Sequence, residues 1–171
     1  MVSETAVILI VEDQEDDVLL IRRAFGKARL NNPVQVVRNG EDAIAYLSGE
    51  GRFANRAEYP LPALVLLDLK LPGLDGFDVL AWIRKREGTR GMPVIVLTSS
   101  NRIPDVNRAY NLGANSFFIK DIDFQNSVAL ADLLHRYWLR VAALPDSSRP
   151  APIIPPKLDG QVPSGGDQIS T

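Results

Sequence analysis

Short apolar segments rich in β-branched residues alternate five times with segments whose apolar residues recur at helical spacing. Such runs are typical of strands buried on both faces, as in parallel sheets whose strands are joined by helices. The expected strands are residues 7–11, 34–37, 64–67, 93–97 and 116–119. The chain is therefore expected to be an α/β protein with a doubly wound, five-stranded parallel sheet.

Five helices are expected to follow these strands. Residues 15–30 place Val18, Ile21 and Phe25 on one face, and the Asn-Asn-Pro segment at 31–33 ends that helix. The other helices are expected near residues 40–49, 76–86, 104–112 and 124–143, with a polar, exposed connection at 50–62. The last helix has apolar residues on two faces, which predicts a partner as well as a core.

Composition excludes several classes of function. The 171 residues carry a net charge of −2 and no long basic run, which disfavours nucleic-acid binding. Without cysteine there is no disulfide, thiol nucleophile or thiolate zinc site. No apolar run is long enough for a membrane span, and no basic segment precedes an apolar one at the N-terminus. A cytoplasmic protein that does not enter membranes is expected.

The composition changes after Pro145. Six of the twelve prolines lie within residues 145–163, and two glycines follow. The folded domain is therefore expected at 6–143, with a Pro/Gly-rich C-terminal extension at 144–171 that is too small to pack as an effector domain. This extension is either a disordered tail or an extended arm that reaches across a dimer. The apolar Ile153 and Ile154 favour the arm.

Polar residues follow four of the expected strands directly. Glu12 and Asp13 follow the first, Asp68 the third, Thr98 the fourth and Lys120 the fifth. Because parallel strands with right-handed crossovers end at one edge of the sheet, these side chains are expected to meet there. Clustered carboxylates repel each other by roughly 4 kcal/mol per close pair at a dielectric constant near 20, which favours a divalent cation such as Mg²⁺. A carboxylate in this setting can accept a phosphoryl group.

The order and spacing of these residues resemble the receiver domain of two-component response regulators. The resemblance also rests on the Leu-Pro-Gly-Leu-Asp-Gly segment at 71–76, on Ser99 and on Gly113-Ala114, and it covers about residues 6–143. It implies a flavodoxin-like, CheY-like sheet with strand order 2-1-3-4-5. The long connection at 50–62 and the Tyr-Trp-Leu run at 137–139 are similar to single-domain regulators that serve bacterial and cyanobacterial phytochromes.

The resemblance implies specific roles for the acidic residues. Asp68 would accept the phosphoryl group from a sensor histidine kinase, with a phytochrome-type kinase as the specific expectation. Asp13, and Glu12 through water, would hold Mg²⁺ together with Asp68 and the backbone carbonyl of Lys70. The protein would be a phosphoacceptor that assists its own phosphorylation and dephosphorylation, not an enzyme, and would signal to a downstream protein or phosphotransfer protein.

The resemblance also implies a switch, with some departures from the family pattern. Thr98 and Lys120 would bind the phosphoryl oxygens, and Phe117 matches the aromatic residue whose rotamer follows the movement of Thr98. Phe117 lacks the hydroxyl of the frequent tyrosine, so such a switch would depend on packing. Asp121 replaces the usual proline after the lysine, and a cis peptide bond there would cost about 2.5 to 4 kcal/mol.

Other interpretations of these residues remain open at the level of sequence. Asp68 could cap a turn, Thr98 could end its strand, and Phe117 could be an ordinary core residue. A phosphohydrolase also uses a strand-end aspartate, but commonly has a second aspartate two positions later, where this chain has Lys70. A scaffold that keeps the fold without being phosphorylated is the third possibility.

The fifth helix and the extension together predict a homodimer. Leu130, Leu133 and Tyr137 lie outside the apolar stripe that the helix would turn toward its own core. Ile153 and Ile154 would reinforce the contact, since burying each contributes about 1.5 to 3 kcal/mol against a cost of about 1 to 2 kcal/mol for ordering each residue. The arm would strengthen a dimer and would not create one.

Overall fold

A single parallel sheet forms the centre of the computed structural model, which describes residues 5–120 and 124–141. Its strands are β1 (Ile8–Val11), β2 (Val34–Val37), β3 (Leu64–Leu67), β4 (Val94–Thr98) and β5 (Ser116–Ile119). They pair in the order β2-β1-β3-β4-β5, and every neighbouring pair is parallel. The expected fold class and strand order are confirmed.

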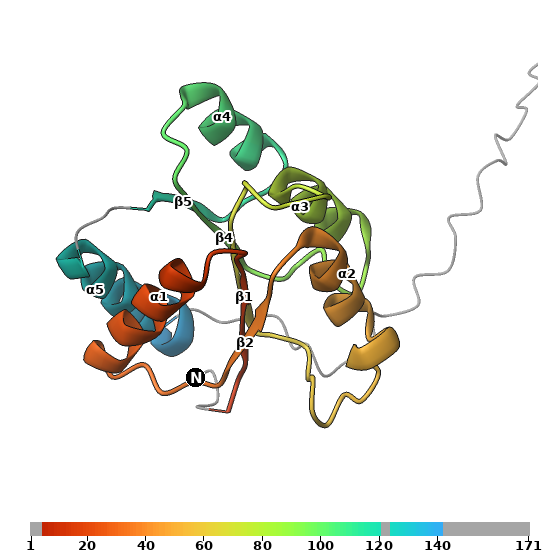
Figure 1. Ribbon diagram of the computed structural model, residues 1–171, viewed down its shortest axis with the longest axis horizontal. Helices are drawn as coiled ribbons and strands as arrows, with labels where there is room; N and C mark the ends of the chain where they lie inside the picture. Colours follow the sequence, from red (N-terminus) through yellow and green to blue (C-terminus); the bar gives the residue numbers. More distant parts are fainter. Residues whose placement is uncertain (1–4, 121–123, 142–171) are drawn as a thin grey trace, which may run out of the picture.

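Helices cover both faces of this sheet (Figure 1). The helices are α1 (Glu15–Lys27), α2 (Gly40–Ser48), α3 (Gly76–Lys85), α4 (Ile103–Asn111) and α5 (Phe124–Leu133), with a 3₁₀ turn η1 (Gly51–Phe53) and a π-helical segment η2 (Leu134–Val141). Helices α1 and α5 pack side by side on one face, and α2, α3 and α4 lie on the other.

The strands bury alternate residues against two separate apolar clusters. In β1, Leu9 and Val11 face the cluster under α2 and α3, whereas Ile8 and Ile10 face the cluster under α1 and α5. All four residues are at most 1% exposed. This burial on both faces explains why β1 and β3 are continuous apolar runs in the sequence, without alternating polar residues.

The connection between α2 and β3 is partly core, so the expectation that residues 50–62 form an exposed connection is wrong for its aromatic residues. Phe53 is 5% exposed, and its ring lies 5.3 Å from that of Tyr46 and 5.2 Å from that of Tyr59. The guanidinium of Arg56 donates to the carbonyl oxygens of Tyr46 and Leu47 at 2.7 and 2.8 Å. The loop therefore covers the end of α2 and satisfies its last carbonyls.

Several element boundaries differ from the expected ones. Helix α1 ends at Lys27, three residues early, because the chain turns through Arg29 with a φ of 55°. Strand β4 includes Thr98, so this residue is the last of its strand and does not follow it. The expected fifth helix changes at Leu134 from α-helical to π-helical hydrogen bonding.

Some expectations fall outside the described residues. These are the peptide at Asp121, the extension at 144–171 and its residues Ile153 and Ile154. Within residues 5–120 and 124–141, no helix is long and apolar enough to cross a membrane.

Candidate functional site

The register of the strands places the acidic residues together at the carboxyl edge of the sheet. Val11 of β1 pairs with Leu67 of β3, so Glu12 and Asp68 are the next residues on adjacent strands. The backbone continues this pairing, since the Asp68 amide donates to the Val11 carbonyl at 3.0 Å. The expected meeting of the first and third strand ends is confirmed.

Three carboxylates form a compact acidic cluster at this edge. Glu12, Asp13 and Asp68 each offer an oxygen atom, and these oxygens lie within 4.8 Å of one another. Glu12 and Asp68 are buried at 2% and 5% exposure. Carboxylate oxygens are the ligands that Mg²⁺ prefers, so the residues present fit a divalent cation.

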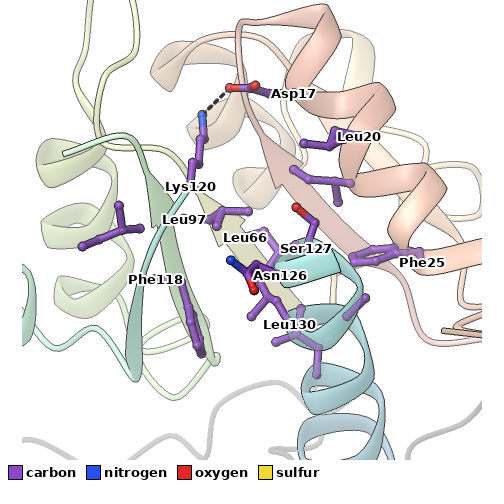
Figure 2. Close-up of a pocket in the computed structure, with 14 residues that line it drawn as sticks. Asp17, Leu20, Phe25, Leu66, Leu97, Phe118, Lys120, Asn126, Ser127 and Leu130 are labelled. Carbon is purple, nitrogen blue, oxygen red and sulfur yellow. Dashed lines mark hydrogen bonds and ion pairs between the residues drawn. The ribbon is translucent and has the colours of Figure 1, made fainter. Parts of the chain in front are cut away.

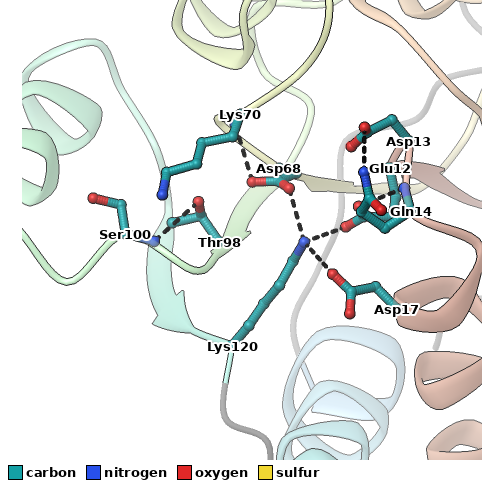
Figure 3. A network of polar contacts seen from close by, with 9 residues as sticks. All are labelled: Glu12, Asp13, Gln14, Asp17, Asp68, Lys70, Thr98, Ser100 and Lys120. Atoms are coloured by element: carbon teal, nitrogen blue, oxygen red, sulfur yellow. Dashed lines mark hydrogen bonds and ion pairs between the residues drawn. The ribbon is translucent and has the colours of Figure 1, made fainter.

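The ammonium group of Lys120 bridges the acids (Figure 3). Its Nζ donates to Asp68 Oδ2 at 2.7 Å, to Asp17 Oδ2 at 2.8 Å and to Glu12 Oε2. Three carboxylate acceptors use all three N–H donors of an ammonium. Lys120 therefore neutralises part of the negative charge of the cluster.

Burial and charge act in opposite directions on these groups. Burial raises the pKa of Glu12, and the hydrogen bond from Lys120 offsets this only in part. Burial alone would lower the pKa of Lys120, but its hydrogen bonds to Asp17, Asp68 and Glu12 together hold that pKa above its ordinary value. Lys120 thus remains a cation at neutral pH.

Thr98 lies on the other side of Asp68 from Glu12, at the end of the adjacent strand β4 (Figure 3). Its side chain is fully buried, and its hydroxyl accepts a long hydrogen bond of 3.4 Å from the amide of Ser100. The Ser100 hydroxyl in turn donates to Asp105 Oδ2 of α4 at 2.5 Å. The loop after β4 is thereby connected to α4 by side-chain contacts.

The loop after Asp68 turns back over this residue. The Lys70 amide donates to Asp68 Oδ1 at 3.1 Å, and Asp75 caps α3 by accepting from the Asp78 amide at 2.9 Å. A Cβ atom at Gly76 would meet the Asp68 carbonyl oxygen at 2.1 Å, so only glycine fits there. This close approach fixes the start of α3 against the acidic residue.

An apolar hollow of about 270 Å³ lies beneath Lys120, between the sheet and helices α1 and α5 (Figure 2). Leu66, Leu97 and Phe118 line its sheet side, and Leu130 lines its α5 side. The methylene stem of Lys120 borders this hollow, while its charged end reaches the carboxylates.

Two polar residues in the network are absent from the sequence-based assignment. Asp17 contacts Lys120, and Gln14 donates from its amide to Glu12 Oε1 at 3.1 Å and from its side chain to Asp13 at 2.6 Å. Asp17 lies in the first turn of α1, whereas Asp13 precedes the helix, so helical i, i+4 spacing does not relate the two residues. The sequence therefore carries no spacing signal that would have identified Asp17.

The remaining predicted residues lie away from the acids. Phe117 of β5 is partly buried and packs against the apolar cluster under α2 and α3. Leu133 and Tyr137 are 56% and 57% exposed, in agreement with their place outside the buried stripe. Leu130 differs, because it is partly buried and packs against the core shared with α1.

Comparison with known proteins places the chain among signalling receivers. The response regulator receiver domain family matches residues 8–132. The chain is 38% identical over 136 residues to the probable methanogenesis regulatory protein FilR2 of Methanothrix harundinacea, across 78% of this chain and 83% of FilR2. It is 33% identical over 139 residues to the response regulator Rcp1 of Synechocystis, across 81% of this chain and 92% of Rcp1.

Solved structures give the same result. The phosphorylated cyanobacterial phytochrome response regulator RcpA superposes with a TM-score of 0.76 at 34% identity, over 83% of this chain and 99% of RcpA. The Mn²⁺-bound form of Rcp1 superposes with a TM-score of 0.75 at 33% identity, over 82% and 99%. Since the family match extends over more than half of the sequence, the chain belongs to the response regulator receiver domains of two-component signalling, with phytochrome response regulators among its relatives.

Proposed function

We propose that this receiver is switched by phosphorylation of Asp68 by a sensor histidine kinase. The observation that supports this most strongly is the joint placement of the buried Asp68 carboxylate with Lys120 at 2.7 Å and with two further carboxylates within 4.8 Å. The relative RcpA is described in a phosphorylated form. A carboxylate held beside a fixed cation is suited to attack an electrophilic phosphorus atom.

In the proposed transfer, a carboxylate oxygen of Asp68 forms a bond to phosphorus as the bond from phosphorus to the kinase histidine breaks. The bonding electron pair stays on the imidazole nitrogen, which takes up a proton from solvent. Lys120 and Thr98 would then bind phosphoryl oxygens, which carry more negative charge than the carboxylate did. Asp68 thereby becomes an acyl phosphate.

Mg²⁺ is the proposed cofactor, and it would offset negative charge on the transferred group when bound. Asp13 and Asp68 would hold it directly, Glu12 through water, and Lys70 through its backbone carbonyl. Support comes from the acidic cluster of this chain and from the relative Rcp1, which is described in a Mn²⁺-bound form. The hydrogen bond from the Lys70 amide to Asp68 keeps the Lys70 backbone next to the cluster.

A mass measurement tests the proposal. Purified protein is incubated with Mg²⁺ and a small-molecule phosphodonor, and its intact mass is recorded promptly. Wild type should gain one phosphoryl group, and Asp68→Asn should gain none because its amide is not a nucleophile. Asp78→Asn, at an exposed acid of α3, is the matched control and should behave as wild type. An unchanged wild-type mass would favour a scaffold that is not phosphorylated.

A phytochrome-type sensor kinase is the proposed phosphodonor, and the cytoplasm the proposed location. The support is the similarity to Rcp1 and to the phytochrome response regulator RcpA. Phosphotransfer from a panel of autophosphorylated sensor kinases would test this, with a phytochrome-type kinase expected to transfer fastest at short times. Faster transfer from kinases of another class would contradict it.

We also propose that the protein forms a homodimer through α5 and η2, and that this surface carries the signal onward. Leu133 and Tyr137 expose more than half of their surface on this helix, where solvent contact with large apolar side chains is unfavourable. The ring of Tyr137 packs edge-on against Trp138 at 5.2 Å, which holds the aromatic group in place.

A further inference from the structure

Among the residues that the structure describes, one carboxylate partner of Lys120 lies outside the acidic cluster. Glu12 and Asp68 are both members of the cluster, whereas Asp17 lies on α1 and contacts the ammonium at 2.8 Å. We propose that Asp17 is a positioning residue, which keeps the Lys120 ammonium beside Asp68 when a divalent cation occupies the cluster. This inference rests on the proposed function of Asp68 and Mg²⁺.

Electrostatic repulsion creates the need for such a residue. A divalent cation held directly by Asp68 and through water by Glu12 would draw on the same two carboxylates that now hold Lys120, and its charge would repel the ammonium. The phosphoryl group still requires that ammonium nearby. Asp17 is outside the metal cluster, so its attraction for Lys120 remains when the cation binds.

The position of Asp17 is well fixed by its helix. The next residue, Val18, is 2% exposed, and Ile21 is also buried in the cluster beneath α1. The Lys120 side chain is 13% exposed and that of Asp17 37%. Figure 3 shows Asp17 reaching Lys120 from the side opposite to the Thr98 strand. Asp17 is therefore placed to hold the ammonium without belonging to the acidic cluster.

The neighbouring Asp16 provides a matched control. It has the same charge and the same helix, but its side chain is exposed. Asp16→Ala and Asp17→Ala each remove one negative charge from the first turn of α1. Any difference between the two variants then reflects the contact with Lys120 and not the general field of the helix.

Chemical labelling of lysines tests the contact without any phosphorylation. Protein is treated with a water-soluble amine-acylating reagent with and without Mg²⁺, and the modification of Lys120 is measured by peptide mass spectrometry relative to the exposed Lys85. With Mg²⁺ present, Lys120 of Asp17→Ala should be acylated about tenfold faster than in wild type, as expected when one charge-assisted hydrogen bond is lost. Asp16→Ala should match wild type.

Asp17→Asn is a second variant that keeps the test valid if Asp17→Ala misfolds. Its amide has nearly the same shape and can still accept a hydrogen bond from Lys120, but it has no charge. Its acylation rate with Mg²⁺ should fall between those of wild type and Asp17→Ala, and its circular dichroism melting curve should match that of wild type. Equal acylation of Lys120 in wild type and in both Asp17 variants would overturn the inference.

A double-mutant cycle tests the consequence for phosphorylation. Asp17→Ala should slow phosphorylation about tenfold in the wild-type background and less than about twofold in a Lys120→Met background, because a positioning residue acts through the lysine. Equal losses in both backgrounds would show that Asp17 acts independently and would overturn the inference. Failure of the proposed function and failure of this inference give different results. If the proposed function is wrong, wild type is not phosphorylated, but the acylation of Lys120 can still be measured and still tests the contact with Asp17.

Discussion

At the scale of single residues, the site holds more negative charge from its acids than its one lysine can neutralise. Glu12 is the most deeply buried acid of the cluster and shares Lys120 with Asp17 and Asp68. Three carboxylates on one ammonium leave negative charge without compensation. The site therefore stores unfavourable energy that a bound cation would release.

The buried carboxyl group of Glu12 gives a pH-dependent prediction. Burial raises its pKa above the ordinary 4.5, so the metal-free folded protein binds this proton more tightly than the unfolded chain. The contribution of Glu12 to stability is thus present below pH 4.5 and is lost as the pH rises through its folded pKa. Glu12→Gln stays neutral and should be more stable than wild type at neutral pH, because the buried carboxylate of wild type must be ionised there.

Urea unfolding in a chelator at several pH values measures this effect. The difference in unfolding free energy between Glu12→Gln and wild type should grow as the pH rises from 4.5 to 7. Glu87→Gln changes an exposed acid and should show a difference near zero throughout. A Glu12→Gln difference that stays constant over this range would contradict the prediction.

Removal of the Lys120 charge should affect stability and metal binding in opposite directions. Lys120→Met leaves three acids without their cation, which should lower the unfolding free energy in chelator by about 3 kcal/mol. The same charge no longer repels Mg²⁺, so the dissociation constant measured by calorimetry should fall about tenfold. Lys27→Met, at the exposed end of α1, has the same charge change and should alter neither quantity. Weaker Mg²⁺ binding by Lys120→Met would show that lysine and metal do not compete.

At the scale of elements, the loop between α2 and β3 is a structural unit and not a spacer. Phe53 is enclosed by Tyr46 and Tyr59, and the hydroxyl of Tyr46 donates to the Pro60 carbonyl at 2.8 Å. The loop is thus fastened to α2 by both apolar and polar contacts.

Truncation of this aromatic side chain should be costly. Phe53→Ala should lower the unfolding free energy by about 3 to 5 kcal/mol, because a buried ring is replaced by a cavity. Phe53→Leu keeps most of the volume and should cost less than about 1.5 kcal/mol. Thermal and urea unfolding measure both values, and a loss below 1 kcal/mol for the alanine variant, as at an exposed position, would refute a core role.

Strands and strand tips were predictable from the sequence, because a buried parallel strand must be apolar throughout and its first polar residue marks its end. This explains the agreement for β3 and for the positions of Glu12, Asp13 and Asp68. The edge strands β2 and β5 are only partly buried, and β2 contains Gln35, so this reason does not account for their agreement. Contacts between distant helical and loop residues were not predictable. Asp17 and Lys120 are 103 residues apart, and Phe53 lies in a polar segment with no periodicity.

Long-range polar anchors were unpredictable for the same reason. Arg84, at the end of α3, donates to the carbonyls of Gly113 and Met92 at 2.9 and 2.8 Å and to the Asn115 side chain at 2.9 Å. In the sequence it is one of several basic residues on a helix. Only the folded arrangement shows that it joins α3 to the segments before β4 and β5.

At the scale of the whole molecule, the exposed apolar residues of α5 and η2 predict self-association. Leu133→Ser combined with Tyr137→Ser should shift a wild-type dimer toward monomer by at least about tenfold in dissociation constant, since two large side chains leave the contact. A concentration series in analytical ultracentrifugation measures this, and Arg136→Ala, at an exposed residue of the same segment, is the control. A monomer at all concentrations, with or without residues 144–171, would refute the proposed dimer.

The separation of the core into two apolar clusters has a practical consequence for spectroscopy. Trp82 packs against the apolar cluster under α2 and α3, and Trp138 packs against the apolar cluster under α1 and α5. These two residues are the only tryptophans of the chain, so each side of the sheet has its own natural fluorophore. Two single-tryptophan variants could therefore follow the melting of each layer separately, and coincident curves would show that the sheet couples both layers into one cooperative unit.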